Sequence, residues 1–184
     1  MRLFFAVPVP PIPAAAELLP ELKKRWPRVR WSPAENLHIT LKFLGEVAEE
    51  SARRVETAAA ETLAPVKTFP ASLAGLGLFR SGRTPLALWI GCGEGGEALA
   101  DAAARLDEAM AGLGFPKEKR LFRAHLTLGR FPPGYAPPVD LAAFKDRPFG
   151  RFSMDRVDLM KSDLSPAGPP AYTVRREFPL RQNI

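Results

Sequence analysis

Residues that bind metals or form disulfides are scarce in this chain of 184 residues, which has one cysteine, Cys92, and only two histidines. A single cysteine excludes an intrachain disulfide, which suits a reducing compartment, and we expect a cytoplasmic protein. Two histidines alone make a poor set of metal ligands, and no carboxylate lies in phase beside either of them. We therefore expect neither a metal nor another cofactor.

Long apolar runs are also missing. No segment is long and apolar enough to span a membrane, so we expect no membrane partner. The composition is that of a globular protein, with 46% hydrophobic and 25% charged residues, and the length suits one domain over residues 1–184, which we expect to be monomeric. The formal charge of +6 favours an anionic partner such as RNA, DNA or a nucleotide, although charge alone fits a basic enzyme without a polyanion equally well.

The order of helix-like and strand-like segments predicts an α+β fold. Apolar residues recur at helical spacing over residues 14–26, 46–63 and 97–113, and a short helix is expected at 139–145. Strand-like segments cover residues 2–9, 37–44, 68–79, 85–91, 125–131, 149–152, 156–161 and 172–180.

The two halves of the chain contain similar elements in a similar order, which we interpret as a weak internal duplication. We expect a bilobal molecule of two similar lobes, each a mostly antiparallel sheet covered by helices, with an active-site cleft between them. The boundary between the lobes is expected between the strand that ends at Gly91 and the helix that follows.

Both histidines lie in the same four-residue pattern, His-x-Thr-Leu, at residues 38–41 and 125–128. Side chains alternate between the two faces of a strand, so His38 and Thr40 share one face, and His125 and Thr127 share one face of the second strand. Facing each other across a cleft, the strands would present two imidazoles and two hydroxyls to one ligand.

This set of groups suits the hydrolysis of a phosphodiester without a metal. A neutral histidine takes a proton from water and a protonated histidine gives one to the leaving oxygen, while the threonine hydroxyls bind the other phosphate oxygens. A lone histidine on a strand is more often a structural residue than a catalyst. Two copies of the pattern that use every histidine in the chain favour catalysis, but their near symmetry does not assign the acid and the base.

Around these histidines the sequence resembles the two-histidine phosphoesterase superfamily, and more closely the bacterial and archaeal RNA 2',3'-cyclic phosphodiesterases, historically called 2'-5' RNA ligases. The resemblance spans nearly the whole chain. It is carried by RLFFAV (2–7), WSPAENLHITLKFLG (31–45), FRAHLTLGR (122–130) and LMKSDLS (159–165), with Gly168 and Tyr172.

The resemblance implies hydrolysis of a terminal RNA 2',3'-cyclic phosphate to a 2'-phosphate, in a basic cleft of a bilobal fold. It implies that His38 is the general acid, which protonates the 3' oxygen, and that His125 is the base. It also implies weak, reversible joining of 2'-5' linked RNA at the same site.

Three basic residues are candidates for binding the substrate. Arg123 and Lys42 are in phase with the histidines, whereas Arg130 reaches the phosphate only where its strand ends or bulges. Each has the alternative of a solvated surface residue.

Four aromatic residues are considered as platforms for a terminal base. Phe43 and Phe122 are out of phase with the histidines and are expected in the core. Trp31 and Tyr135 lie in loop-like segments and are the better candidates.

Two other functions stay open. The same site could act on a small cyclic nucleotide or on ADP-ribose cyclic phosphate, which only a comparison of substrates separates. A non-catalytic RNA-binding module is the alternative of another class, and the lack of RNA-binding repeats or a dense patch of aromatic and basic residues argues against it.

Overall fold

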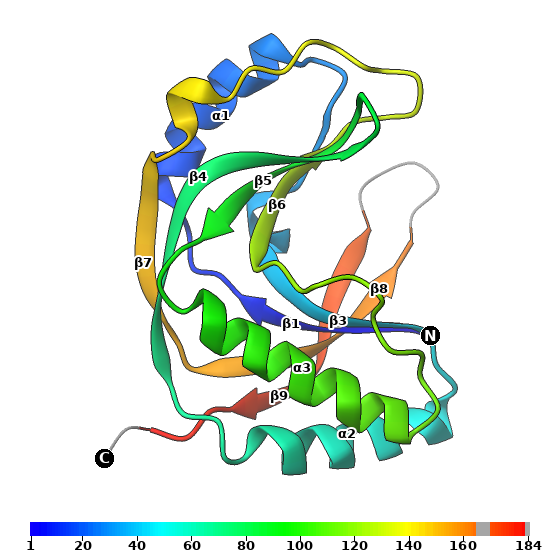
Figure 1. Cartoon of the computed structure of the whole chain (residues 1–184). Helices are drawn as coiled ribbons and strands as arrows, with labels where there is room; N and C mark the ends of the chain where they lie inside the picture. Colours follow the sequence, from blue (N-terminus) through cyan, green and yellow to red (C-terminus); the bar gives the residue numbers. More distant parts are fainter. Residues whose placement is uncertain (165–169, 183–184) are drawn as a thin grey trace.

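Two antiparallel sheets form the framework of the chain, in a computed structural model that describes residues 1–164 and 170–182 (Figure 1). Ser165 and Gly168, which carry part of the sequence resemblance, lie outside the described residues. In chain order the strands are β1 (Arg2–Pro8), β2 (Arg30–Trp31), β3 (His38–Glu46), β4 (Phe69–Ser81), β5 (Thr84–Cys92), β6 (His125–Arg130), β7 (Pro148–Met154), β8 (Arg156–Asp163) and β9 (Ala171–Pro179).

One sheet has the strand order β3-β1-β8-β9 and the other has the order β2-β6-β5-β4-β7. The α+β fold with two antiparallel sheets is therefore confirmed. The expected boundary after Gly91 is wrong, because β5 and β6 on its two sides pair within one sheet. The C-terminal strands β8 and β9 instead join β1, so that each sheet draws strands from both halves of the chain.

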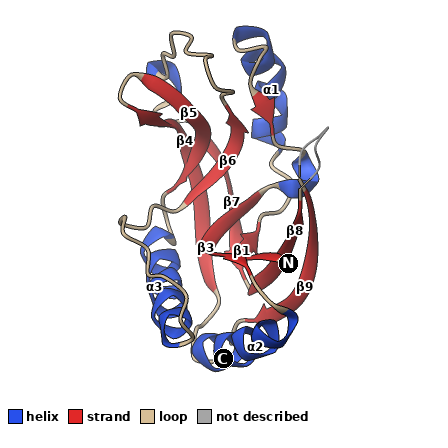
Figure 2. Cartoon of the chain, turned by 90° about the vertical axis from the view of Figure 1, so that its right-hand side faces the viewer, coloured by secondary structure: helices blue, strands red, loops and turns tan. Residues whose placement is uncertain are grey.

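The helices lie at opposite ends of the molecule (Figure 2). Helix α1 (Pro13–Arg25) contacts β7 in the five-stranded sheet, and its first turn begins with a proline, where no backbone N–H is needed. Helix α2 (Glu49–Leu63) contacts β9, and α3 (Gly96–Gly112) contacts both β3 and α2. Each sheet is therefore covered by at least one helix.

The segments differ from the predicted bounds in two places. Helix α2 begins at Glu49 and not at Glu46, because β3 continues to Glu46 and the N–H of Val47 donates to the carbonyl of Met1 (2.8 Å). The short helix expected at residues 139–145 is a single 3-10 turn, η2 (Ala142–Phe144).

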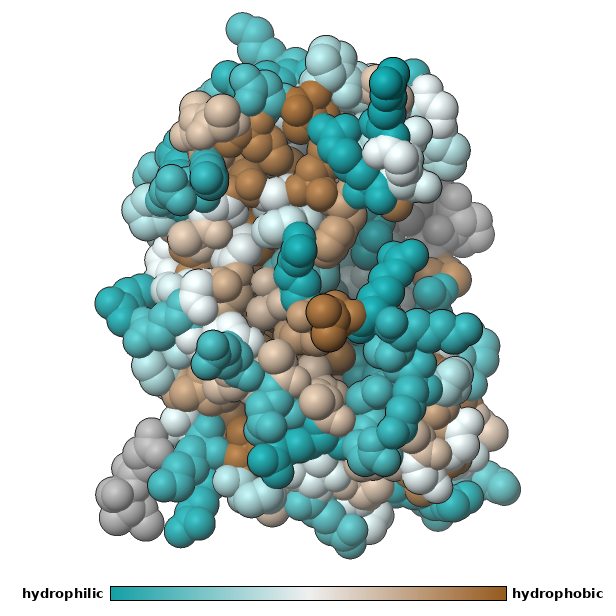
Figure 3. All heavy atoms as spheres, in the orientation of Figure 1, coloured by the Kyte–Doolittle hydropathy of each residue, from teal (hydrophilic) through white to brown (hydrophobic). Residues whose placement is uncertain are grey.

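Apolar side chains fill the space between sheets and helices. The sides of α2 and α3 that face inward carry Ala52, Val55, Ala59, Leu99, Leu106 and Met110, all 0% exposed. Polar residues cover most of the face shown in Figure 3, and apolar side chains gather in its upper half. Among the described residues, no helix is both long and apolar enough to cross a membrane.

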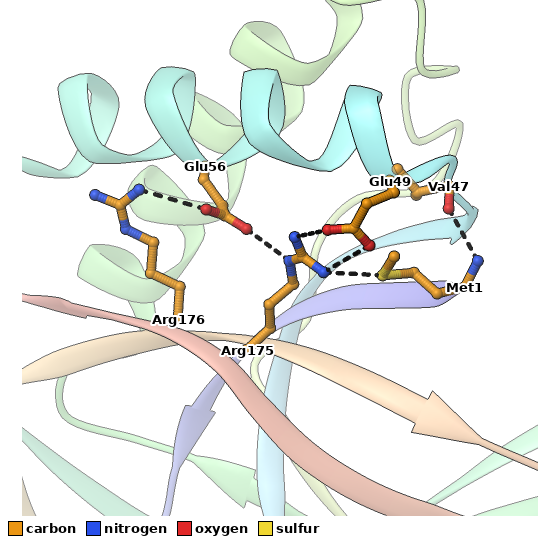
Figure 4. Close-up of polar contacts among 6 residues, drawn as sticks. All are labelled: Met1, Val47, Glu49, Glu56, Arg175 and Arg176. Atoms are coloured by element: carbon orange, nitrogen blue, oxygen red, sulfur yellow. Dashed lines mark hydrogen bonds and ion pairs between the residues drawn. The ribbon is translucent and has the colours of Figure 1, made fainter.

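A cluster of charged side chains fastens the last strand to α2 (Figure 4). The Arg175 guanidinium on β9 donates to Glu56 Oε1 (2.6 Å) and to Glu49 Oε1 (2.5 Å), and Arg176 lies 3.5 Å from Glu56 Oε2. The hydrogen bond from Arg175 holds the pKa of Glu49 below its ordinary value. Because β9 pairs with β8 and β8 with β1, this cluster closes the four-stranded sheet against α2.

Candidate active site

The two motif strands, β3 and β6, come from different sheets and contact each other. Between the sheets lies a hollow of about 920 Å³ that is lined by His38, Thr40, His125 and Thr127 together. The alternation of side chains along each strand thus presents both histidines and both threonines to one space, as the motif indicates.

The two imidazoles are held in the same way. His38 Nδ1 lies 2.7 Å from the carbonyl oxygen of Asn36, and His125 Nδ1 lies 2.6 Å from that of Arg123, in each case two residues earlier in the chain. A carbonyl oxygen only accepts, so each Nδ1 carries the hydrogen that it donates. Each Nε2 is then an acceptor in the neutral ring and a donor in the protonated ring.

Aromatic rings surround both imidazoles. The ring centroid of His38 lies 5.1 Å from that of Phe4 and 5.2 Å from that of Tyr172, and His125 lies 4.7 Å from Phe79 and 6.2 Å from Trp89. Such neighbours remove water from the rings and disfavour the charged form.

Burial is accordingly the largest influence on both histidines and lowers the pKa of each, although the backbone hydrogen bond of each opposes it. The positive charge of Arg130 lowers the pKa of both rings further. In the free protein both imidazoles are therefore neutral at pH 7, and an anionic phosphate between them would favour protonation of one.

Gly77 on β4 makes room for one of these aromatic neighbours. A β-carbon at this position would lie 2.1 Å from atoms of the Trp89 indole, which stands on the adjacent strand β5. An indole cannot yield by turning its far end, so the glycine allows Trp89 to lie flat across β4 and reach His125.

A β-bulge follows each motif and changes which side chains face the hollow. The pairing of β1 with β3 skips Leu41, and the pairing of β5 with β6 skips Leu128, the leucine of each His-x-Thr-Leu. An extra residue in one strand reverses the alternation after it. The fifth residue after each histidine, Phe43 or Arg130, therefore comes to the histidine face.

Arg130 lines the hollow beside both histidines, and it forms no ion pair within the described part of the chain. The bulge at Leu128 is the condition under which the sequence allowed it to reach a phosphate. Its guanidinium is thus placed to bind an anion between the imidazoles.

Lys42 does not share the face of His38 and Thr40, and this expectation is corrected. The bulge turns it toward α3, where its side chain is 2% exposed. Its Nζ donates to the carbonyl of Pro116 (2.6 Å) and lies 2.6 Å from Asp107 Oδ1 and 3.8 Å from Glu118 Oε1. The charge of Lys42 is therefore already compensated and does not meet a substrate in the cleft.

The same bulge corrects the expectation for Phe43, which is 50% exposed at the hollow and not in the core. Phe122 is half-buried and packs against the core as expected, although one side of it borders the cleft. Trp31 lines the hollow. Tyr135 does not, and lies against Phe131 and beneath the guanidinium of Arg28.

A second hollow, of about 630 Å³, lies beside the first and shares Thr40, Phe43, His125, Thr127 and Arg130 with it. Arg123 lines this second hollow and stacks on Trp89, with its guanidinium carbon 5.9 Å from the ring centroid. The expected cleft residue Arg123 is thus in place, on the side away from Trp31 and Tyr172.

Sequence reasoning missed several residues that border the histidines. Tyr172 was noted only as part of the C-terminal resemblance, and Phe79 and Asn36 were not singled out. Asn36 supports the site twice, since its carbonyl accepts from His38 and its Nδ2 donates to the carbonyl of Pro170 (3.1 Å) beside β9. Only a pairing of β9 with the motif lobe could have indicated Tyr172, and the sequence order does not contain that pairing.

Residues 1–164 and 170–182 contain no group of three or more His, Cys, Asp or Glu side chains placed to share a metal ion. The pKa of the Cys92 thiol is raised by burial, and its sulfur donates to the carbonyl of Glu94. Neither finding adds a ligand to the two histidines.

Known proteins with similar sequences and folds are available for comparison. Residues 10–166 match the family model of the 2'-5' RNA ligase superfamily. The RNA 2',3'-cyclic phosphodiesterase of Archaeoglobus fulgidus is 38% identical over 73% of this chain and 75% of its own, and that of Methanocaldococcus jannaschii is 33% identical over 97% and 100%. The crystal structure of E. coli LigT complexed with 3'-AMP superposes with a TM-score of 0.77 at 27% identity, covering 97% of each chain.

Proposed function

The chain belongs to the 2'-5' RNA ligase superfamily, among the RNA 2',3'-cyclic phosphodiesterases, and we propose that it hydrolyses a terminal 2',3'-cyclic phosphate of RNA to a 2'-phosphate without a metal. The observation that carries the proposal is the matched pair of imidazoles, each held through Nδ1 by the carbonyl two residues earlier and each lining one hollow.

The two Nε2 atoms divide the proton transfers between them. His125 Nε2 takes a proton from water as the water oxygen bonds to phosphorus, and the protonated His38 Nε2 gives its proton to the 3' oxygen as the bond from phosphorus to that oxygen breaks. The phosphate remains on the 2' oxygen. Exchange of one proton from His125 to solvent and one from solvent to His38 restores the starting state. The assignment of His38 as acid follows the family resemblance.

The remaining phosphate oxygens gain negative charge in the transition state. The hydroxyls of Thr40 and Thr127 donate to them, and the guanidinium of Arg130 supplies a positive charge that faces both imidazoles. Because that same charge lowers the pKa of both histidines, the bound phosphate offsets it and allows His38 to hold a proton.

RNA is favoured as substrate by the names of the relatives and by the lining of the first hollow. Its arginines, Arg30 and Arg130, and the rings of Trp31 and Tyr172 suit a phosphate and a base. All of these groups come from one chain, in keeping with a monomer. A cytoplasmic location also belongs to the proposal, and it rests on the single cysteine of the sequence.

Product analysis tests this function. An RNA oligonucleotide with a 2',3'-cyclic end is incubated with the protein in EDTA, and we expect a 2'-phosphate end. A 3'-phosphate product would reverse the leaving group, and no opening of the ring in EDTA would contradict a metal-independent hydrolase.

A comparison of substrates sets the chemical class. We expect a cyclic-ended oligonucleotide to be hydrolysed with a higher kcat/KM than adenosine 2',3'-cyclic phosphate or ADP-ribose cyclic phosphate. The reverse order would favour a phosphodiesterase of small nucleotides. Salt-dependent RNA binding without turnover would favour a binding module.

A further inference from the structure

The second hollow differs from the first in which histidine it contains. His125 lines both hollows, whereas His38 lines only the first. The residues that the two share, which include both threonines and Arg130, are those expected to hold the phosphate. The phosphate site therefore lies where the two hollows join, with a space on either side of it.

We propose that the second hollow binds a nucleotide whose 5'-hydroxyl replaces water as the nucleophile, so that this hollow decides between transfer to RNA and hydrolysis. The inference rests on the proposed function, because it uses the same phosphate and the same two histidines. It assigns to Arg120, Leu121 and Phe43 the binding of the incoming nucleotide.

The direction of attack supports this assignment. In a displacement at phosphorus, the nucleophile and the leaving oxygen lie on roughly opposite sides. The leaving 3' oxygen is next to His38, so the nucleoside that carries the cyclic phosphate occupies the first hollow. The nucleophile must then approach from the side of His125, and the second hollow is the space on that side.

The lining of the second hollow suits a nucleotide better than it suits water. Leu121 is 99% exposed and Phe43 is 50% exposed, and both border this space. A water molecule needs no such apolar surface, but a base gains from stacking on it. Exposed apolar groups at a cleft are typical of a binding surface.

The charge of this lining is positive. Arg120 and Arg123 border the hollow and have no ion pair among the described residues. Its acidic residues, Asp107 and Glu118, both lie against the ammonium group of Lys42. Two guanidinium groups therefore remain for the backbone phosphate of an incoming strand.

The transfer step balances without any further reactant. The 5' oxygen bonds to phosphorus and gives its proton to His125 Nε2, while the bond to the 3' oxygen breaks and that oxygen takes a proton from His38 Nε2. The product is a 2'-5' phosphodiester. The difference from hydrolysis is only in the group that occupies the side of His125.

A competition between acceptors tests the assignment. The protein reacts with a cyclic-ended RNA oligonucleotide in the presence of methanol and a dinucleotide with a free 5'-hydroxyl, and the methyl ester, the joined RNA and the hydrolysed end are quantified. Methanol reports the same chemistry without filling the hollow. The variants are Arg120→Ser and Leu121→Ser, and the controls are Arg54→Ser on the exposed side of α2 and Val174→Ser, which is 47% exposed on β9.

We expect the ratio of dinucleotide transfer to methanol transfer to fall at least about fivefold in each variant, as loss of a stacking or phosphate contact predicts, and to stay at the wild-type value in both controls. An unchanged ratio in the variants overturns the inference, as does a wild-type protein that hydrolyses but never joins the dinucleotide. Failure of the wild type to open the ring at all contradicts the proposed function instead.

A further measurement separates the incoming nucleotide from the body of the substrate RNA. If Arg120→Ser and Leu121→Ser raise KM for a cyclic-ended oligonucleotide but not for a cyclic mononucleotide, the second hollow holds the substrate's own chain, and the inference is overturned. We expect the two substrates to respond alike.

Discussion

At the scale of single residues, the site depends on two hydrogen bonds and one guanidinium. The bonds at Nδ1 orient both imidazoles, and Arg130 acts on both at once. These groups have opposite effects on the pKa of the histidines, since the backbone carbonyls raise it and Arg130 lowers it. The protonation of the pair is therefore set by a balance that one substitution can shift.

Arg130→Gln tests that balance. We expect kcat/KM to fall by roughly 100-fold, the loss typical of a group that stabilises charge in a transition state. Because the arginine disfavours both imidazolium forms, its removal raises the pKa of both histidines. Both limbs of the pH profile of kcat/KM, which reports the free enzyme, should then move to higher pH.

Arg30→Gln is the matched control for this substitution. Arg30 lines the same hollow and removes the same charge, but it is not among the groups that shift either histidine. Its pH limbs should stay where they are in the wild type. Limbs that remain in place in Arg130→Gln, or that move equally in both variants, would contradict the role of Arg130.

At the scale of elements, the segments themselves could be predicted from periodicity, and the two motif strands begin at the predicted histidines. What could not be predicted is their phase after the motif. A bulge has no signature in His-x-Thr-Leu, so strict alternation put Lys42 in the cleft and Phe43 in the core, and both are the other way round. The pairing of β8 and β9 with β1 was equally hidden, because strand order in a sheet is decided by contacts far apart in the sequence.

The bulge in β3 gives Lys42 a structural task, which is to tie this strand to α3 and to the segment before His125. Replacing Lys42 with methionine leaves the carboxylate of Asp107 without its partner. We expect the free energy of unfolding to fall by about 1–3 kcal/mol, less than for a fully buried pair because Asp107 is 20% exposed. Chemical denaturation at pH 7 measures this loss.

Lys161→Met is the control, since Lys161 and Asp163 form an ion pair in which both side chains are largely exposed, and it should cost under about 0.5 kcal/mol. Although burial opposes it, the hydrogen bond from Lys42 lowers the pKa of Asp107. The contribution of the Lys42 pair is therefore present at neutral pH and is lost as the pH falls through that lowered pKa, so the two proteins should converge in acid. Equal losses in Lys42→Met and Lys161→Met would contradict this tie.

At the scale of the whole molecule, two sheets that share no strand are joined so that one histidine comes from each. Neither sheet alone contains an acid and a base. The doubled motif allowed this arrangement to be predicted, because two strands with the same exposed face need a common ligand to explain them. The way in which the chain crosses between the sheets was not predictable, and it makes the four-stranded sheet depend on the last strand, β9, and on Arg175.

The most direct test of the two-histidine account is the activity of His38→Ala and His125→Ala on a cyclic-ended RNA in EDTA, with thermal denaturation of both variants as a check on folding. We expect each substitution to lower kcat by at least about 100-fold, because each removes one of two proton transfers that water alone replaces poorly. Full activity in both folded variants would contradict the account.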